Sequence, residues 1–188
     1  GTDAGHVRVY SNIVPVNGCT DSTALNYDPL ATVDDGSCCY NSFWNQVGQD
    51  IDGEAANDRS GSSVSLSNDG YTVAIGAHSN DGNGSNAGHV RIYQNIGGLW
   101  SQIGADIDGE AADDLSGRSV SLSSDGNTVA IGAIYNDDNG WNSGHVRVYE
   151  NIGGLWFQIG ADIDAEAAGD LSGYSVSLSS DGNTVAIG

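Results

Sequence analysis

The sequence repeats itself every 56 residues, and this period restricts the fold more than any other feature. Trp44, Trp100 and Trp156 recur at that spacing, and residues 100–132 and 156–188 differ at only four of 33 positions. A fixed period of this length indicates a small supersecondary unit that buries its apolar face against its neighbours. We therefore expect a stack of similar units rather than one asymmetric core.

Each unit contains four short stretches with strand character. Val90 and Ile92 alternate with polar or aromatic residues in the segment GHVRIY, and Val129 and Ile131 share one face of TVAIG. An Asp-Gly pair precedes TVAIG and favours a tight hairpin, because it tolerates positive φ. The stretches of one repeat are 88–94, 100–107, 119–123 and 128–132. The predicted fold class is all-β, with β-propeller blades of four antiparallel strands.

The repeats divide into units near 44–99, 100–155 and 156–188, and residues 1–13 carry one further GHVRVY strand. The chain thus holds about three permuted blades. Because propellers close with about four to eight blades, we expect a fragment of a larger propeller, with further blades and any signal peptide outside it.

One link between strands is much longer than its copies. Residues 14–43 stand where later units have only the three residues 97–99. All three cysteines, Cys19, Cys38 and Cys39, fall in this insert. Clustered cysteines in a short, loop-rich segment indicate a local disulfide and an oxidising, extracellular compartment.

The charge of the chain excludes two classes of partner. The sequence has 25 acidic residues against five arginines and no lysine, for a formal net charge of −20. Such a surface repels phosphate backbones and anionic lipids, so we expect no nucleic-acid binding, and it attracts divalent cations. No stretch approaches the ~18 apolar residues of a membrane helix, so no membrane insertion is expected.

The repeat resembles the FG-GAP family, whose best-known members are the integrin α-subunit propellers. The motif Ser-Gly-x-Ser-Val stands at 60–64, 116–120 and 172–176, and Asp-Gly-x-Thr-Val-Ala-Ile-Gly-Ala stands at 69–77 and 125–133. The resemblance implies extracellular, non-enzymatic propeller blades. The family's Asp-x-Asp-x-Asp-Gly calcium loop is replaced by Ser-x-Asp-Gly, so that site is not carried over. The remaining aspartates are interpreted as turn residues: Asp69, Asp125 and Asp181.

The insert resembles short acidic modules of secreted proteins that begin Gly-Cys-Thr-Asp and end Asp-Asp-Gly-Ser-Cys. The resemblance implies a Cys19–Cys38 disulfide, with Cys19–Cys39 as the alternative. Acidic and amide side chains in the module are candidate calcium ligands, although simple solvation explains them equally well. These candidates are Asp21, Asn26, Asp28, Asp34 and Asp35.

Two loops before GHVR differ between repeats and are candidates for ligand contact. Asp81 in one loop, and Asp137 and Asp138 in the other, are candidate calcium ligands, with turn formation as the equal alternative. The candidate ligand-contact residues are His78, Tyr135 and Trp141.

Two further patterns recur in every unit. Asp106, Asp108 and Glu110 alternate, which suits either calcium ligands or, as we favour, a charged edge strand. His89 and His145 occupy one repeat position beside an arginine, and we interpret them as structural because catalysis rarely needs a residue in every blade.

The sequence contains no nucleophile elbow, no zinc-finger spacing and no phosphate-binding loop, so no enzyme is predicted. We expect a non-enzymatic extracellular or cell-surface binding or adhesion protein that presents its loops to a protein or glycan, with calcium assisting. The alternative is a structural scaffold or spacer within a larger secreted protein. A third possibility is a propeller enzyme with its catalytic residues in other blades.

Overall fold

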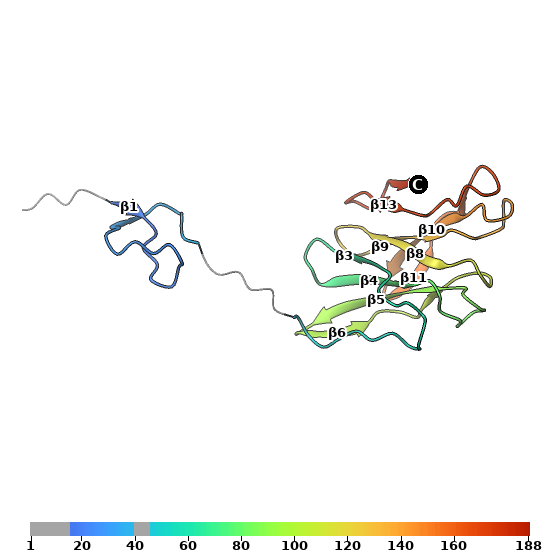
Figure 1. Cartoon of the computed structure of the whole chain (residues 1–188), viewed down its shortest axis with the longest axis horizontal. Coiled ribbons are helices and arrows are strands. Elements are labelled where there is room, and N and C mark those ends of the chain that lie inside the picture. Colours follow the sequence, from blue (N-terminus) through green and yellow to red (C-terminus); the bar gives the residue numbers. More distant parts are fainter. Residues whose placement is uncertain (1–15, 40–45) are drawn as a thin grey trace, which may run out of the picture. The chain divides into compact units, whose positions relative to one another are not determined.

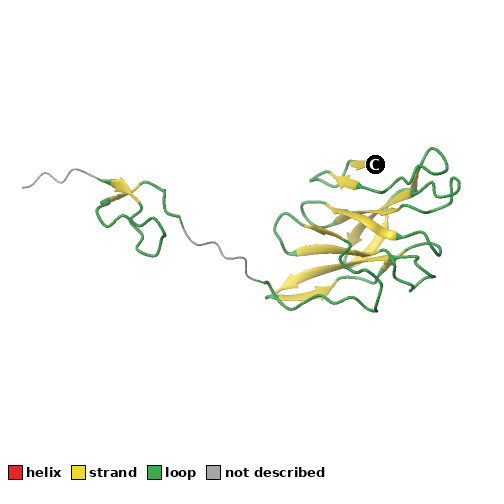
Figure 2. Cartoon of the chain, viewed as in Figure 1, coloured by secondary structure: helices red, strands yellow, loops and turns green. Residues whose placement is uncertain are grey.

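The structure is a computed structural model that describes residues 16–39 and 46–188. The chain divides into two compact units, Gly1–Gln46 and Val47–Gly188. The described residues form strands and turns without any helix, and so without a helix long and apolar enough to cross a membrane (Figure 2). The predicted repeat strand within residues 1–13 lies outside the described residues.

The first unit contains the acidic module. Strand β1 (Asn17–Gly18) pairs in parallel with β2 (Val33–Asp34). The Cys19–Cys38 disulfide is confirmed, and Cys39 is free and exposed. Few apolar side chains besides that of Cys19 are buried in this unit. The disulfide therefore supplies much of the stability that a hydrophobic core supplies in a larger domain.

The second unit contains two complete antiparallel sheets (Figure 1). The first sheet has the order β3-β4-β5-β6, and the second has the order β8-β9-β10-β11. The strands of the first are β3 (Ser63–Leu66), β4 (Thr72–Ala77), β5 (His89–Ile96) and β6 (Leu99–Gln102). Those of the second are β8 (Ser116–Leu122), β9 (Thr128–Ala133), β10 (His145–Ile152) and β11 (Leu155–Gln158). The prediction of an all-β fold with four antiparallel strands per repeat is confirmed.

Three shorter elements complete the second unit. Strand β7 (Ile107–Asp108) pairs with β5, and β12 (Ile163–Asp164) pairs with β10. Strands β13 (Val176–Leu178) and β14 (Val185–Ile187) form a hairpin that repeats the start of the preceding sheets.

The strand predicted over 100–107 is broken in the structure. Strand β6 pairs with the end of β5 and β7 with its beginning, and between them Gly104 has a φ of 75°. That left-handed conformation turns the chain out of the ladder. The Trp100 strand therefore closes the first sheet, and each sheet extends across the boundary between two sequence repeats.

Neighbouring sheets pack closely through small residues. The Ser63 hydroxyl donates to the Gly117 carbonyl and Ser119 to that of Gly173, each at 2.7 Å. A Cβ atom added at Gly132 would overlap the Gly173 carbonyl oxygen. Strand β8 contacts β3 and β4 on one side and β13 on the other (Figure 1).

The apolar core lies between the two complete sheets. It includes Val90 and Ile92 of β5 together with Val129 and Ile131 of β9, all at most 1% exposed. Trp156 packs against this cluster and donates its indole N–H to the Ile103 carbonyl. The apolar alternation in the sequence thus fills the space between units, which explains why one unit alone has no core of its own.

Candidate functional site

A buried histidine begins the third strand of each complete sheet. His89 and His145 are each 1% exposed. In the ladder, His145 lies directly opposite Asp164 of β12, and His89 lies opposite Asp108 of β7. Antiparallel pairing therefore brings the acidic segment after each tryptophan strand beside the histidine of the same sheet.

Carboxylates surround the imidazole of His145. Its Nδ1 lies 3.9 Å from an oxygen of Glu110, 3.9 Å from one of Asp162 and 4.0 Å from one of Asp164. Ligand atoms of Glu110, Asp138, His145 and Asp162 all lie within 4.8 Å of one another. We call these four residues the His145 cluster.

The preceding repeat builds a smaller copy of the same arrangement. His89 Nδ1 lies 3.7 Å from an Asp106 oxygen and 3.9 Å from a Glu54 oxygen, and we call these three residues the His89 cluster. Gly82 stands one repeat before Asp138, so the His89 cluster lacks the corresponding carboxylate.

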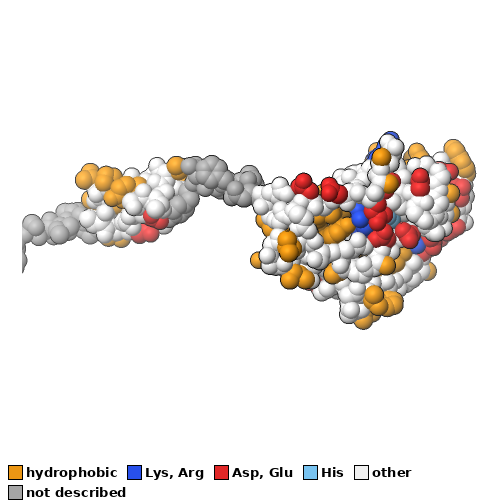
Figure 3. All heavy atoms as spheres, turned by 90° about the horizontal axis from the view of Figure 1, so that it is seen from below, with side chains coloured by type: hydrophobic (Ala, Val, Ile, Leu, Met, Phe, Trp, Pro, Cys, Tyr) orange, Lys and Arg blue, Asp and Glu red, His pale blue; other side chains and the backbone are white. Residues whose placement is uncertain are grey.

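An arginine holds the glutamate of each cluster. Arg147 donates to the Asp108 carbonyl oxygen at 2.7 Å, and its other terminal nitrogen lies 3.4 Å from Glu110 Oε1. The second oxygen of Glu110 is thereby left facing His145. Arg91 does the same for Glu54 in the first sheet. Figure 3 shows carboxylates gathered beside arginine and histidine side chains on one face of the second unit.

Electrostatics around the clusters reflects partial burial. Burial raises the pKa of Asp108, and the neighbouring Asp106 charge raises it further. Burial also raises the pKa of Tyr149, whose ring lies 5.6 Å from the Arg147 guanidinium carbon. Removing water from acidic groups that lie close together disfavours their charged forms, and a bound cation would offset this cost.

Sequence patterns identified the acidic strip and the histidines separately but did not show that they meet. The acidic strip was interpreted as a charged edge strand and the histidines as structural. The signal that links them is that Glu, His and Asp recur at the same 56-residue offset: Glu54 with Glu110, His89 with His145, and Asp106 with Asp162.

The loop aspartates separate into two roles. Asp81 accepts a hydrogen bond from the Asn86 amide at 2.7 Å, and Asp137 accepts one from the Asn142 amide at 2.6 Å. These two aspartates therefore close their own loops, while Asp138 alone reaches a cluster.

The three candidate ligand-contact residues differ in exposure. His78 is 8% exposed, and its Nδ1 lies 2.8 Å from the Ser62 hydroxyl, so it does not stand on the surface. Burial lowers the pKa of His78, and the charges of Arg118 and Arg59 lower it further. Tyr135 is 39% exposed and Trp141 is 74% exposed, so these two are accessible.

The acidic side chains of the module accept hydrogen bonds from nearby backbone amides. The carboxylates of Asp21, Asp28, Asp34 and Asp35 each accept a hydrogen bond from an amide two residues later. Asn26 accepts from the Cys39 amide and donates to the Ser37 carbonyl. Among residues 16–39, no three carboxylate, imidazole or thiol groups come together as a cluster.

Buried aspartates that sequence reasoning missed anchor the variable loops. Asp114 is 4% exposed and accepts hydrogen bonds from Asn136 Nδ2 and the Ala111 amide, each at 3.2 Å. Asp58 holds Asn80 in the same way. Burial raises the pKa of Asp114. Only the recurrence of Asp-x-Ser-Gly before each inner strand distinguishes these residues in the sequence.

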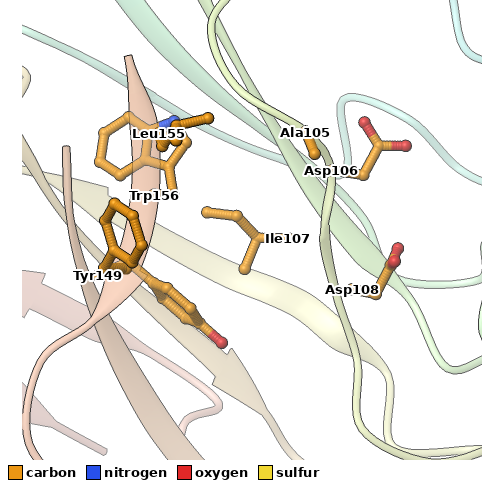
Figure 4. Close-up of a pocket in the computed structure, with 8 residues that line it drawn as sticks. Ala105, Asp106, Ile107, Asp108, Tyr149, Leu155 and Trp156 are labelled. Atoms are coloured by element: carbon orange, nitrogen blue, oxygen red, sulfur yellow. The ribbon is translucent and has the colours of Figure 1, made fainter. Parts of the chain in front are cut away.

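A hollow of about 340 Å³ lies between β7 and the outer strands of the second sheet. Tyr149 and Trp156 form one wall, and Ile107 points toward them, whereas Asp106 and Asp108 point to the opposite side of their strand (Figure 4). The hollow is thus apolar toward the sheet, and Asp106 on its other side belongs to the His89 cluster.

These features define an all-β repeat protein in which similar sheets pack side by side and present their interstrand loops. Residues 51–93 and 105–149 match the FG-GAP repeat, so these two repeats of the chain belong to that family. The FG-GAP repeat is a non-enzymatic repeat fold of the binding type, and such repeats, like disulfides, are typical of extracellular proteins.

A short segment is also similar to an unrelated kind of protein. It is 49% identical over 41 residues to "Ribulose bisphosphate carboxylase/oxygenase activase, chloroplastic" of Spinacia oleracea. The match covers 22% of this chain and 9% of the activase. The similarity is therefore local.

Proposed function

We propose that this chain is a non-enzymatic binding or adhesion segment of an extracellular or cell-surface protein, and that its loops contact a protein or glycan. The observation that carries the proposal is Trp141, a large aromatic side chain that is 74% exposed at the tip of a well-anchored loop. Exposed aromatic residues on rigid supports are typical anchors of recognition surfaces, because they lose little entropy on binding.

The loop around Trp141 is held at several points. Gly169 donates its amide to the Trp141 carbonyl at 2.9 Å, and Asn139 donates to the Ala165 carbonyl at 2.5 Å. Asn136 is buried against Asp114. In the preceding repeat the same framework carries Ser85 where Trp141 stands. A constant framework with a variable tip is the arrangement expected of a binding repeat.

Divalent cations have a supporting role in the proposal, and calcium is the ion expected from the sequence. Asp138 belongs both to the Trp141 loop and to the His145 cluster. A cation held by its carboxylate and those of Glu110 and Asp162 would fix the base of the loop. Calcium or another divalent cation added to chelator-treated protein should then raise the melting temperature and strengthen partner binding.

The test is an array of glycans and extracellular-matrix proteins probed with the whole chain. Trp141→Ala should weaken binding of any hit by at least about tenfold, whereas Ser85→Ala, at the same position one repeat earlier, should leave it unchanged. Equal binding by both variants would refute the role of this loop.

The scaffold alternative is favoured by the near-identity of the repeats and by the serine bonds between sheets. Ser65 and Ser121 each accept a hydrogen bond from an amide of the following sheet at 2.9 Å. An array on which the folded protein binds nothing would favour this alternative.

A further inference from the structure

We propose that Glu110, Asp138, His145 and Asp162 form a binding site for a divalent transition-metal ion such as zinc, and that Glu54, His89 and Asp106 form a weaker copy one repeat earlier. Neither site depends on the proposed contact with a protein or glycan. The metal would join the segment before β8, which contains Glu110, to the segment after β11, which contains Asp162.

The first argument is an unpaired nitrogen inside the His145 cluster. His145 is 1% exposed, and its Nδ1 has no hydrogen-bond partner. The nearest carboxylate oxygens, at 3.9 Å, are too distant to accept a hydrogen bond. A buried polar atom without a partner is costly, and a metal ion bound by this nitrogen and the carboxylates around it would satisfy it.

The second argument is the spacing of the donors. Two ligands bound about 2.1 Å from a tetrahedral zinc ion lie about 3.4 Å apart. The distances from His145 Nδ1 to Glu110 and Asp162 are each 3.9 Å, so movements of well under 1 Å would complete the site. The side chains of Glu110 and Asp162 are 39% and 24% exposed, and they are free enough to make that adjustment.

The chemistry of the donors selects the ion. Calcium and magnesium prefer ligand sets made of oxygen alone, whereas an imidazole nitrogen together with carboxylates suits zinc and its neighbours in the first transition series. A calcium ion would leave the His145 nitrogen without a partner. The cluster therefore favours a transition metal over calcium.

The charges around the imidazole are consistent with a bound dication. Asp164 adds a carboxylate 4.0 Å from the same nitrogen, and Arg147 is the cation that contacts the cluster, through Glu110. Carboxylates therefore outnumber the positive groups, and a dication would relieve their repulsion. Arg147 also fixes one oxygen of Glu110, so the other is already directed at the site.

The position of the His145 cluster gives the metal a structural consequence. Glu110 follows β7, which pairs with the first sheet, and Asp162 precedes β12, which pairs with His145's own strand. One ion would thus connect residues 52 positions apart in the sequence across the boundary between consecutive sheets. Binding to the folded state alone raises stability, so metal should hold the stack together.

The His89 cluster offers a comparison within the same chain. It repeats the glutamate, histidine and aspartate but has Gly82 where the His145 cluster has Asp138. Fewer ligands lower affinity, so two classes of site are expected, with the His145 cluster the tighter.

The experiment uses the whole chain with Cys39→Ser, which removes the exposed thiol as a competing ligand. Chelator-treated protein is titrated with zinc chloride by calorimetry, and its melting temperature is recorded with zinc, with calcium and without metal. Glu110→Gln and Asp138→Gly each remove one donor from the His145 cluster. Glu166→Gln is the matched control, because Glu166 occupies the same repeat position but belongs to neither cluster.

We expect two zinc ions per chain and a higher melting temperature in zinc than in an equal concentration of calcium. Glu110→Gln and Asp138→Gly should each weaken the tighter site by at least about tenfold, and Asp138→Gly should make the two sites similar. Glu166→Gln should match the parent protein. Zinc should also shift the Nδ1 resonance of His145 in nitrogen NMR.

Three results would overturn the proposal. One is a tighter zinc site that keeps its affinity in both the Glu110→Gln and Asp138→Gly variants, which would place that ion elsewhere. Another is equal stabilisation by calcium and zinc, which would mean that the imidazole takes no part. The third is a His145 ring protonated at both nitrogens and unresponsive to zinc, which would mean that a proton fills the role assigned to the metal.

Discussion

The contact between sheets predicts that one added methyl group at Gly132 destabilises the protein. Gly132 lies on β9, and a Cβ there would overlap the Gly173 carbonyl oxygen of the next sheet and meet the Ser119 hydroxyl at 2.5 Å. Ser119 donates to that same carbonyl at 2.7 Å. Gly132→Ala must therefore push the sheets apart or break this hydrogen bond.

The size of the effect follows from these two contacts. Overpacking a close contact costs about 1–3 kcal/mol, and losing the Ser119 hydrogen bond costs about 0.5–1.5 kcal/mol. With both costs together, the free energy of unfolding should fall by about 1.5–4.5 kcal/mol. For a domain of this size the melting temperature should drop by roughly 3–18 °C.

Urea denaturation followed by circular dichroism measures the change directly, and a constant m-value would show that the unfolded state is unaffected. Gly76→Ala provides a second test, because Gly76 meets Gly117 and Ser63 in the same way at the preceding boundary. Ser101→Ala on an exposed face of β6 is the control and should change stability by less than about 0.5 kcal/mol. If both glycine variants matched this control, the close packing of the sheets through small residues would be wrong.

Three further predictions concern the module, the loop anchors and the turns. Cys19→Ser should remove the disulfide and expose residues 16–39 to protease while the repeats stay resistant. In the chain-entropy model, closing a loop of this size adds about 3 kcal/mol to the free energy of unfolding. Equal protection from protease with and without the bond would contradict this role. Asp114→Ala should cost about 1–3 kcal/mol in urea denaturation because Asn136 Nδ2 and the Ala111 amide each lose their acceptor, whereas Asp170→Ala, at the same repeat position but exposed, should cost less. The Ser179 hydroxyl and the Asn183 amide lower the pKa of Asp181 to about 2, so the stability from this turn is present above the ordinary carboxyl pKa of 3.8 and is lost as the pH falls through about 2. Ser179→Ala should raise the pKa of Asp181 in an NMR titration, and an unchanged value would exclude the hydroxyl as the cause.

Local sequence patterns predicted much of the fold. Alternation at Val90 and Ile92 placed both residues in the core, and the Asp-Gly turn before Thr128 joins β8 to β9 as predicted. The Ser-x-Asp-Gly aspartates are turn residues, as Asp69 shows by accepting from the Ser67 hydroxyl and the Tyr71 amide. These features depend on neighbours a few residues apart, which sequence periods describe well.

Other predictions failed or stayed open because they depended on distant residues. The strand over 100–107 is broken because Gly104 leaves the ladder, and His78 is buried where Ser62, just before β3, lies beside it. The exposure of a loop residue depends on what packs over it, and this information is absent from its own segment of sequence.

By itself, the sequence determined the 56-residue unit, its antiparallel strands, the acidic character of the chain and the module that carries the cysteines, because each of these is written in local composition or spacing. Only the tertiary structure decided that Glu110, His145 and Asp162 meet around one unpaired nitrogen. In the chain, Glu110 lies 35 residues before His145, and Asp162 lies 17 residues after it. The pairing of β12 with β10 and the passage of the 109–115 segment between the sheets bring them together. Strand order and sheet-to-sheet packing depend on residues far apart in the chain. The 56-residue period therefore shows that the cluster residues recur, but only the folded sheets show that they lie together.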